Sequence, residues 1–296
     1  MKITGKTKIA GVFGYPITHS LSPILHNAAF DQLGLNFVYL PFLVRPEDLE
    51  EAIKAIRALN MVGVNITVPF KEKVITYLDE LSPEAKMIGA VNTIYNEKGK
   101  LIGCNTDIDG FIRSLTTAGK FNPQGKNVLL MGAGGAGSAI SFALIKAGVK
   151  KLMITNRTNE KSKALLNHLR EIFKNKCKLS FLDFSRRNMP EIMSKVDLFI
   201  NATSVGMHPE DPLLIDPNLL AKTAFIYDVI YNQETKLLQA ARKRGLPGIG
   251  GLEMLIYQGA LSFEIWTHQR APIRAMRRAL KEIIIQPPRH EDTKII

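Results

Sequence analysis

Residues 127–137 read Asn-Val-Leu-Leu-Met-Gly-Ala-Gly-Gly-Ala-Gly, an apolar run followed by a loop rich in glycine. The apolar run predicts a buried strand, and the residues after it predict a helix that ends near Gly148. Gly132, Gly134 and Gly137 therefore form a G-x-G-x-x-G motif between a strand and a helix, the setting that dinucleotide binding requires. Backbone amides and the positive end of the helix dipole would stabilise a pyrophosphate there. For the motif taken alone, a tight turn without a ligand is the alternative.

The next predicted strand, Lys151–Thr155, is followed by Asn156-Arg157-Thr158, with Lys161 shortly after. An NAD site normally has an acidic residue at this point, which accepts hydrogen bonds from the ribose hydroxyls. A guanidinium, a hydroxyl and an ammonium group favour a 2′-phosphate, and one charge-assisted hydrogen bond contributes about 1.5–3 kcal/mol. These residues predict NADP (NADPH) as the cofactor, and an ordinary capped helix start is the alternative.

The rest of the chain alternates short apolar runs with amphipathic segments, which is typical of α/β folds with mostly parallel strands. With 296 residues and 46% apolar content, we expect two domains. The strands expected before the glycine motif are Ile9–Phe13, Phe37–Phe42 and Val62–Val68, followed by a hairpin of Val91–Tyr95 and Lys100–Cys104. Those expected after it are Leu179–Asp183, Val196–Ile200 and Phe225–Val229, with helices from Gly251 to about Ile285.

Composition and charge argue against several classes of protein. The net charge is +12, and part of it recurs at helical spacing from Arg270 to Lys281 beside an apolar stripe, as on a solvated helix face. Without interleaved aromatic residues or zinc-finger spacing, we expect no nucleic-acid binding. The chain lacks a run of roughly 18 apolar residues and the apolar core of a signal peptide, so we expect a cytoplasmic protein that does not bind membranes. Cys104 and Cys177 lack metal-ligand spacing, so we expect no metal site and reduced thiols.

A second candidate site begins in Val64-Asn65-Ile66-Thr67-Val68-Pro69-Phe70-Lys71. The alternation predicts one core face, Val68 included, and one polar face with Asn65 and Thr67. Pro69 ends the strand, so these polar groups and Lys71 are expected at its carboxyl end, where open α/β sheets bind ligands. For Lys71 by itself, a solvated lysine at a helix start is the alternative.

Two helix starts add further polar groups. Ser20 and Ser22 precede a predicted helix whose positive dipole end, together with two hydroxyl donors, suits a carboxylate; Ser22 as the N-cap of that helix is the alternative. Asp107 is either an N-cap itself or, if Thr106 caps the helix with Asp109 as capping-box partner, a carboxylate that can contact a ligand. Together, these groups indicate a small, acidic, hydroxyl-rich ligand.

Eight motifs carry a family resemblance. They are Ser20-Leu21-Ser22-Pro23, Asn65-x-Thr67-x-Pro69-Phe70-Lys71, Gly89-Ala90-Val91-Asn92-Thr93, Asn105-Thr106-Asp107, Asn156-Arg157-Thr158, Asn201-Ala202-Thr203, Asp228-Val229-Ile230-Tyr231 and Gly251-x-x-Met254-Leu255-x-x-Gln258. In this order, and across nearly the whole chain, they resemble shikimate dehydrogenases. Ser138, after the last loop glycine, departs only modestly from the common pattern.

The resemblance implies an NADPH-dependent, reversible reduction of 3-dehydroshikimate to shikimate, in the biosynthesis of chorismate and the aromatic amino acids. Ser20 and Ser22 would bind the substrate carboxylate, and Lys71 with Asp107 would form the catalytic pair, the lysine supplying the proton. The residues implied around the ring and its hydroxyls are Asn65, Thr67, Asn92, Asp107, Tyr231 and Gln258. Those implied around the cofactor are Gly132, Ala133, Gly134, Gly135, Ala136, Gly137, Asn156, Arg157, Thr158, Lys161, Thr203, Val229 and Gly251.

The resemblance also implies how the domains are divided. Residues 1–107 and 252–285 would form a discontinuous open α/β substrate domain with a mainly parallel sheet, because the helices after residue 251 return to it. Residues 108–251 would form a Rossmann-like NADP-binding domain, and residues 286–296 a flexible tail. Nicotinamide and substrate would meet in a cleft between the domains. A quinate/shikimate dehydrogenase that uses NAD and a non-catalytic dinucleotide-binding sensor are the alternatives, and monomer and homodimer both remain open.

Overall fold

The computed structural model describes residues 2–174 and 176–285, and the chain divides into two compact units. The first unit takes the described residues up to Glu80, then Thr93–Ile102, and those from Gly259 onward; the second takes Leu81–Asn92 and Gly103–Gln258. Residues 81–92, 103–107 and 252–258 thus belong to the second unit, although the sequence prediction placed them in the first. The assignment of one unit to substrate and the other to cofactor stays a prediction, and the predicted tail 286–296 lies outside the described residues.

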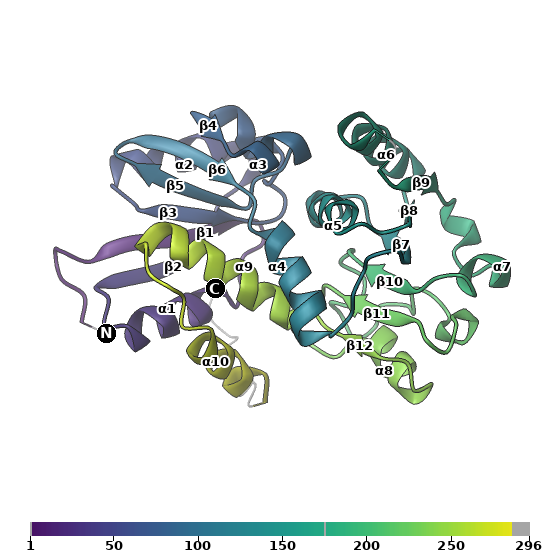
Figure 1. Cartoon of the computed structure of the whole chain (residues 1–296). Helices are drawn as coiled ribbons and strands as arrows, with labels where there is room; N and C mark the ends of the chain where they lie inside the picture. The colour runs from purple at the N-terminus through teal and green to yellow at the C-terminus, as the bar shows by residue number, and fades with distance from the viewer. Residues whose placement is uncertain (1, 175, 286–296) are drawn as a thin grey trace. The chain divides into compact units, whose positions relative to one another are not determined.

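The first unit is built on a six-stranded sheet in the order β2-β1-β3-β5-β6-β4 (Figure 1). Its strands are β1 (Lys8–Gly14), β2 (Phe37–Leu43), β3 (Gly63–Ile66), β4 (Glu80–Leu81), β5 (Thr93–Glu97) and β6 (Lys100–Cys104). β1 pairs in parallel with both β2 and β3, whereas β3 pairs with β5 in antiparallel fashion. The carboxyl ends of β1 and β3 therefore lie at the same edge of the sheet.

Two helices at opposite ends of the chain pack together in this unit. α1 (Ser22–Gln32) packs against α10 (Ile273–Ile285) and against β2. Met276 and Leu280 of α10 are buried, while Arg274 and Arg278 are exposed, as expected for a solvated basic helix face. The other helical segments of this unit are η1 (Pro46–Asp48), α2 (Leu49–Ala58), η2 (Lys73–Tyr77) and the later turns of α9 (Leu252–Thr267).

The second unit contains a six-stranded sheet in the order β12-β11-β10-β7-β8-β9, and its pairs are all parallel. Its strands are β7 (Asn127–Met131), β8 (Lys151–Thr155), β9 (Lys178–Phe181), β10 (Leu198–Asn201), β11 (Phe225–Asp228) and β12 (Gly248–Ile249). This is the doubly wound order of dinucleotide-binding domains, with the order reversing between β7 and β10. The α/β fold and the Rossmann-like arrangement predicted from the sequence are confirmed.

Helices cover both faces of this second sheet. Val128 and Leu130 of β7 belong to one apolar core, and Leu129 and Met131 belong to another, so successive side chains of β7 are buried on opposite faces. The helical segments of this unit are α3 (Pro83–Ile88), α4 (Asp107–Arg113), the π-helical turn η3 (Ser114–Ala118), α5 (Gly135–Lys146), α6 (Asn159–Phe173), η4 (Phe184–Arg186), α7 (Pro190–Met193), η5 (Pro217–Leu219) and α8 (Lys236–Lys243). Among the described residues, no helix has both the length and the apolar character needed to span a membrane.

Candidate active site

The glycine motif connects β7 to α5 in the second unit. Gly132 has a φ of +114°, and a Cβ atom built on it would lie 2.6 Å from the carbonyl oxygen of Ala202. A Cβ atom on Gly137 would overlap the carbonyl oxygen of Gly132, so both glycines are required by close backbone approach. A Cβ atom on Gly134, at the N-cap position of α5, would meet no protein atom within 4 Å. The loop therefore leaves open space at the positive end of the α5 dipole, as a pyrophosphate requires.

The polar residues after β8 are accessible to solvent at the start of α6. Arg157, Thr158 and Lys161 are exposed, and Asn156 donates a hydrogen bond from Nδ2 to the carbonyl oxygen of Thr158 at 3.0 Å. Thr158 occupies the N-cap position without a side-chain capping bond, so the capped helix start offered as an alternative is wrong. Within residues 2–174 and 176–285, no carboxylate forms an ion pair with either cation. Two cations and a hydroxyl are thus exposed at the strand end where a 2′-phosphate would bind.

Asp228, at the end of β11, connects the loops that follow β10 and β11. Its Oδ1 accepts hydrogen bonds from Asn201 Nδ2 at 2.9 Å and from the Ile230 amide at 3.1 Å, and its Oδ2 accepts one from Thr235 Oγ1 at 2.7 Å. Asn201 in turn accepts from the amide and hydroxyl of Thr203, at 2.9 and 2.7 Å. Burial raises the pKa of Asp228 to about 6. This network fixes the loops that carry the predicted cofactor residues 203 and 229.

Gly251 completes the group of predicted cofactor residues in this unit. A Cβ atom on Gly251 would overlap the carbonyl oxygen of Val229, and one on Gly132 would lie 3.2 Å from Thr203 Cγ2. The structure thus brings Gly251 to Val229 and Gly132 to Thr203. The amide of Ala202 also donates to the carbonyl of Met131 at 2.7 Å, which keeps the ends of β10 and β7 together.

Three predicted ring-binding residues, far apart in the sequence, also meet in the second unit. Asn92 Nδ2 donates to Asp107 Oδ1 at 2.9 Å and lies 3.4 Å from Gln258 Oε1. All three side chains are buried, with exposed fractions of 2, 5 and 9%. A Cβ atom on Gly110 of α4 would lie 2.7 Å from Gln258 Cβ, so glycine at this position lets α9 approach α4. Gln258 is therefore a buried residue of α9, although a glutamine on a helix is usually exposed.

The start of α4 differs from both capping alternatives. The helix begins at Asp107, and Thr106 holds the N-cap position but makes no side-chain capping bond. The Thr106 hydroxyl and amide instead bond the Asn92 side chain, with Thr106 N donating to Asn92 Oδ1 at 2.7 Å. Neither the Asp107 cap nor the Thr106–Asp109 capping box is formed, because the Asn92 amide competes for these groups.

In the first unit, the strand predicted to carry Asn65 and Thr67 is shorter than expected. Asn65 is buried and Lys71 is half-buried, whereas Val68 is 65% exposed. The prediction that Val68 lies in the core was wrong, because β3 ends at Ile66. The amide of Phe70 then donates to the carbonyl of Thr67 at 2.9 Å, and the chain turns there. Side chains alternate between faces only while the backbone stays extended.

Thr67 connects this strand end to the serine loop after β1. A Cβ atom on Gly14, the last residue of β1, would overlap Thr67 Cγ2, so the two strand ends are in contact. Beyond it, Ser20 Oγ accepts a hydrogen bond from the amide of Ser22 at 3.3 Å. Ser22 is the first residue of α1 rather than its N-cap, which is Leu21. Helical bonding starts one residue earlier than expected, since the Leu25 amide donates to the Leu21 carbonyl at 3.2 Å.

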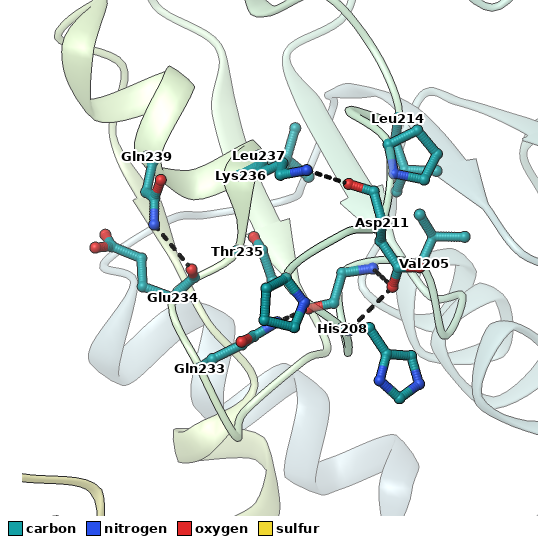
Figure 2. A pocket seen from close by; sticks show the side chains of 13 residues that line it. Val205, His208, Asp211, Leu214, Gln233, Glu234, Thr235, Lys236, Leu237 and Gln239 are labelled. Carbon is teal, nitrogen blue, oxygen red and sulfur yellow. Dashed lines mark hydrogen bonds between the residues drawn. The ribbon is translucent and has the colours of Figure 1, made fainter.

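A separate pocket of about 200 Å³ lies between the loop after β10 and the start of α8 (Figure 2). Asp211 Oδ2 accepts from the amides of Gly206 and His208, at 2.7 and 3.1 Å, and Lys236 Nζ donates to the Asp211 carbonyl at 2.8 Å. Of the residues that the structure describes, none of those predicted for the site lines this pocket. Tyr231 is half-buried outside it, and burial raises its pKa.

Models of three protein families match most of the chain. They are the shikimate dehydrogenase substrate binding domain over residues 12–94, shikimate / quinate 5-dehydrogenase over 116–208, and the shikimate 5'-dehydrogenase C-terminal domain over 251–281. A protein named shikimate dehydrogenase (NADP(+)) from Desulforamulus reducens is 46% identical over 282 residues, which cover 94% of this chain and 96% of the relative. The chain belongs to the shikimate dehydrogenase family.

Solved structures of the family have the same fold. A shikimate dehydrogenase crystallised in complex with NADP+ is 41% identical, with a TM-score of 0.88 over 96% of this chain and 98% of its own. The Listeria monocytogenes shikimate 5-dehydrogenase, in complex with shikimate and NAD, is 37% identical, with a TM-score of 0.86 over 95% of this chain and 98% of its own. The family resemblance predicted from the eight sequence motifs is confirmed.

Sequence reasoning missed several side chains that support the site residues. Tyr39, Thr93 and Ser262 surround Asn65 through hydrogen bonds, and no motif singled out Tyr39 or Ser262. Asp228 was quoted only as part of a family motif, without a role. Its position at the end of an apolar strand was the available signal, because a carboxylate there is buried unless the chain turns outward.

Proposed function

We propose that this member of the family is an NADP-dependent shikimate dehydrogenase that interconverts 3-dehydroshikimate and shikimate, a step of chorismate and aromatic amino acid biosynthesis. The observation that supports this most strongly is the buried cluster of Asn92, Asp107 and Gln258. These residues are separated by up to 166 positions in the chain, and the family resemblance assigns all three to one ring-binding site. A cluster of buried amides and a carboxylate suits a polar, hydroxylated ligand.

The second unit fits NADP at two places. Gly132 and Gly137 permit the close backbone approach of the loop, and Gly134 leaves open space at the α5 N-terminus for the pyrophosphate. Arg157 and Lys161 are exposed where the 2′-phosphate would lie. When bound, the nicotinamide supplies the hydride for reduction or accepts it in oxidation.

The remaining groups bind the substrate and move its proton. The hydroxyls of Ser20 and Ser22, at the N-terminus of α1, would bind the substrate carboxylate, where the helix dipole favours negative charge. Lys71 would give a proton to the alkoxide oxygen that forms during reduction and take it back during oxidation. Asp107, whose Oδ1 is held by Asn92, would orient the reacting hydroxyl and the lysine. Asn65, Thr67, Tyr231 and Gln258 would contact the ring.

Use of NAD is the alternative that one finding favours, since the Listeria monocytogenes structure contains NAD. The exposed Arg157, Thr158 and Lys161 favour NADP in this chain, because no acidic residue follows β8 directly. We also infer that the enzyme acts in the cytoplasm as a monomer or homodimer and needs no partner besides its small-molecule ligands.

Consumption of NADPH and NADH with 3-dehydroshikimate and 3-dehydroquinate, compared side by side, tests the proposal. We expect the NADPH–3-dehydroshikimate pair to give the highest kcat/KM by about tenfold or more, the preference that one charge-assisted hydrogen bond confers. Equal rates with both cofactors would reject the role given to Arg157. No turnover with any pair would reject the enzymatic assignment.

A further inference from the structure

Asn65 lies in a buried cluster of hydroxyl groups in the first unit. Tyr39 Oη donates to Asn65 Oδ1 at 2.7 Å, and Asn65 Nδ2 donates to Thr93 Oγ1 and Ser262 Oγ, both at 3.0 Å. Thr93 Oγ1 and Ser262 Oγ are themselves 2.9 Å apart. Asn65 is 6% exposed and the other three residues are buried, so water does not compete strongly for these bonds.

The cluster determines which atom of the amide can receive a substrate hydroxyl. An amide nitrogen has two hydrogens, and both are donated here, to Thr93 and Ser262. The oxygen is held by the Tyr39 phenol and can accept more than one hydrogen bond. Asn65 therefore acts as an acceptor toward a ligand, and loss of the phenol would let the amide rotate or leave its oxygen without this donor.

Tyr39 is itself held by two consecutive residues of α1. The side-chain amide of Asn27 donates to the Tyr39 carbonyl at 3.0 Å and accepts from the Tyr39 amide at 2.9 Å, as a neighbouring strand would. The ring of His26 stacks on the Tyr39 ring, with a centroid distance of 4.3 Å and an interplanar angle of 9°. Both the backbone and the ring of Tyr39 are therefore fixed by one helix.

The stacking histidine is neutral. Burial lowers the pKa of His26 to about 3, against a smaller opposing effect of the Asn65 side chain. Trp266 lies 5.3 Å from the His26 ring and donates from Nε1 to the Ile94 carbonyl at 3.0 Å, which closes the aromatic cluster. An uncharged ring can pack against Tyr39 over the whole working pH range without disturbing the phenol–amide hydrogen bond.

We propose that Tyr39 is a positioning residue whose hydroxyl fixes the Asn65 amide as the acceptor for a substrate hydroxyl, with α1 holding Tyr39 through His26 and Asn27. The inference rests on the proposed function, because it assumes that the substrate is a hydroxylated ring such as shikimate. α1 also begins at Ser22, so the proposed carboxylate site and the support of the hydroxyl site share one helix. α1 would therefore set the spacing between the groups that bind the substrate carboxylate and the group that binds its hydroxyl.

Tyr39→Phe removes only the hydroxyl and tests the proposal. We expect the KM for shikimate to rise about tenfold, the equivalent of one hydrogen bond, while the KM for NADP and kcat change by less than about twofold. Tyr227→Phe is the matched control, because Tyr227 is equally buried and its hydroxyl donates to Ser114 Oγ at 2.8 Å in the second unit. It should lower Tm to a similar degree and leave the KM for shikimate unchanged.

A double-mutant cycle separates positioning from general damage. In an Asn65→Ala background, Tyr39→Phe should cause no further rise in the KM for shikimate, because the amide it positions is gone. The proposal is overturned if Tyr39→Phe leaves the KM for shikimate unchanged, if its effect persists in full in the Asn65→Ala background, or if it raises both KM values equally. Failure of the proposed function would appear differently, as a wild-type protein that neither binds nor turns over shikimate, and that result would overturn the inference as well.

Discussion

Asp228→Asn is predicted to remove a pH dependence from the free energy of unfolding. Asp228 is fully buried at the end of β11, where burial raises the pKa of its carboxyl from 3.8 to about 6. The hydrogen bonds from Thr235, Ile230 and Asn201 oppose this rise without cancelling it. At neutral pH the folded protein therefore contains a carboxylate that is less favourably ionised than in the unfolded chain.

The sign and size of the effect follow from the two pKa values of Asp228. A carboxyl with a raised pKa in the folded state contributes most to stability at low pH, and this contribution is lost as pH rises from about 4 to 6. One unit of pKa corresponds to about 1.36 kcal/mol, so the full loss is about 3 kcal/mol. Between about pH 4.5 and about pH 7.5, the loss is about 2 kcal/mol, because the unfolded carboxylate is already largely ionised at the lower pH.

Urea unfolding of the wild type and Asp228→Asn at these two pH values measures the prediction. The wild-type free energy of unfolding minus that of the variant should fall by about 2 kcal/mol from the lower to the higher pH. Asp211→Asn is the control: amides of His208 and Gly206 lower the pKa of Asp211 below 3.8, so this carboxyl is largely ionised in both states at the two pH values and the same difference should stay nearly constant. A wild-type–Asp228→Asn difference that stays constant or rises with pH would refute the reasoning.

Three further substitutions test the proposed site. Lys71→Ala should lower kcat by about 10²–10⁴-fold with little change in NADPH affinity, and wild-type turnover in steady-state kinetics would exclude the lysine from proton transfer. Arg157→Ala should raise the KM for NADPH about tenfold or more and leave that for NADH unchanged, whereas Arg170→Ala, in the last turn of α6, should change neither. Gly137→Ala should reduce the free energy of unfolding by about 1–3 kcal/mol, since its Cβ overlaps the Gly132 carbonyl. An unchanged urea midpoint and an unchanged KM for NADPH would contradict that close approach.

The sheet of the second unit could be predicted closely from the sequence. Its four central strands, β8, β7, β10 and β11, are buried and apolar, and β7 and β8 match the predicted residues 127–131 and 151–155. The edge strand β9 is only partly buried, and the two-residue edge strand β12 was not predicted. The glycine loop was recognisable because close backbone approach admits only glycine at residues 132 and 137. In this part of the chain, the residue types that the local structure favours are also those that the tertiary packing requires.

The ends of elements were harder to predict in the first unit. Val68 continues the alternation of β3, but the strand ends at Ile66, and only the pairing with neighbouring strands determines that end. The helix starts at Ser22 and Asp107 differ from the expected caps for a related reason. At the first helix, the bond from the Leu25 amide to the Leu21 carbonyl starts the helix one residue earlier than expected. At the second, the Thr106 amide donates to the distant Asn92 side chain.

The side chains that support the site residues could not be predicted from local sequence patterns. Ser262 bonds Asn65 across 197 positions, and Gln258 lies beside Asn92 across 166. Motif spacing placed Asn65 and Asp107 at strand and helix ends but contained no information on which distant hydroxyl or amide would face them. Tertiary packing of α9 brings these partners to Asn65 and Asn92, and no local pattern encodes that packing.

The two units hold their proposed substrate groups by the same physical device. The Asn65 amide is held by Tyr39, and the Asp107 carboxylate is held by Asn92, in each case by a buried side chain. A buried polar group left without a partner costs about 1–3 kcal/mol, so each proposed substrate group is already oriented before a ligand arrives. Because these side chains are already fixed in the folded protein, they lose little conformational entropy when the substrate binds. Substitutions that remove one supporting hydroxyl or amide should therefore weaken substrate binding even though they touch no substrate atom.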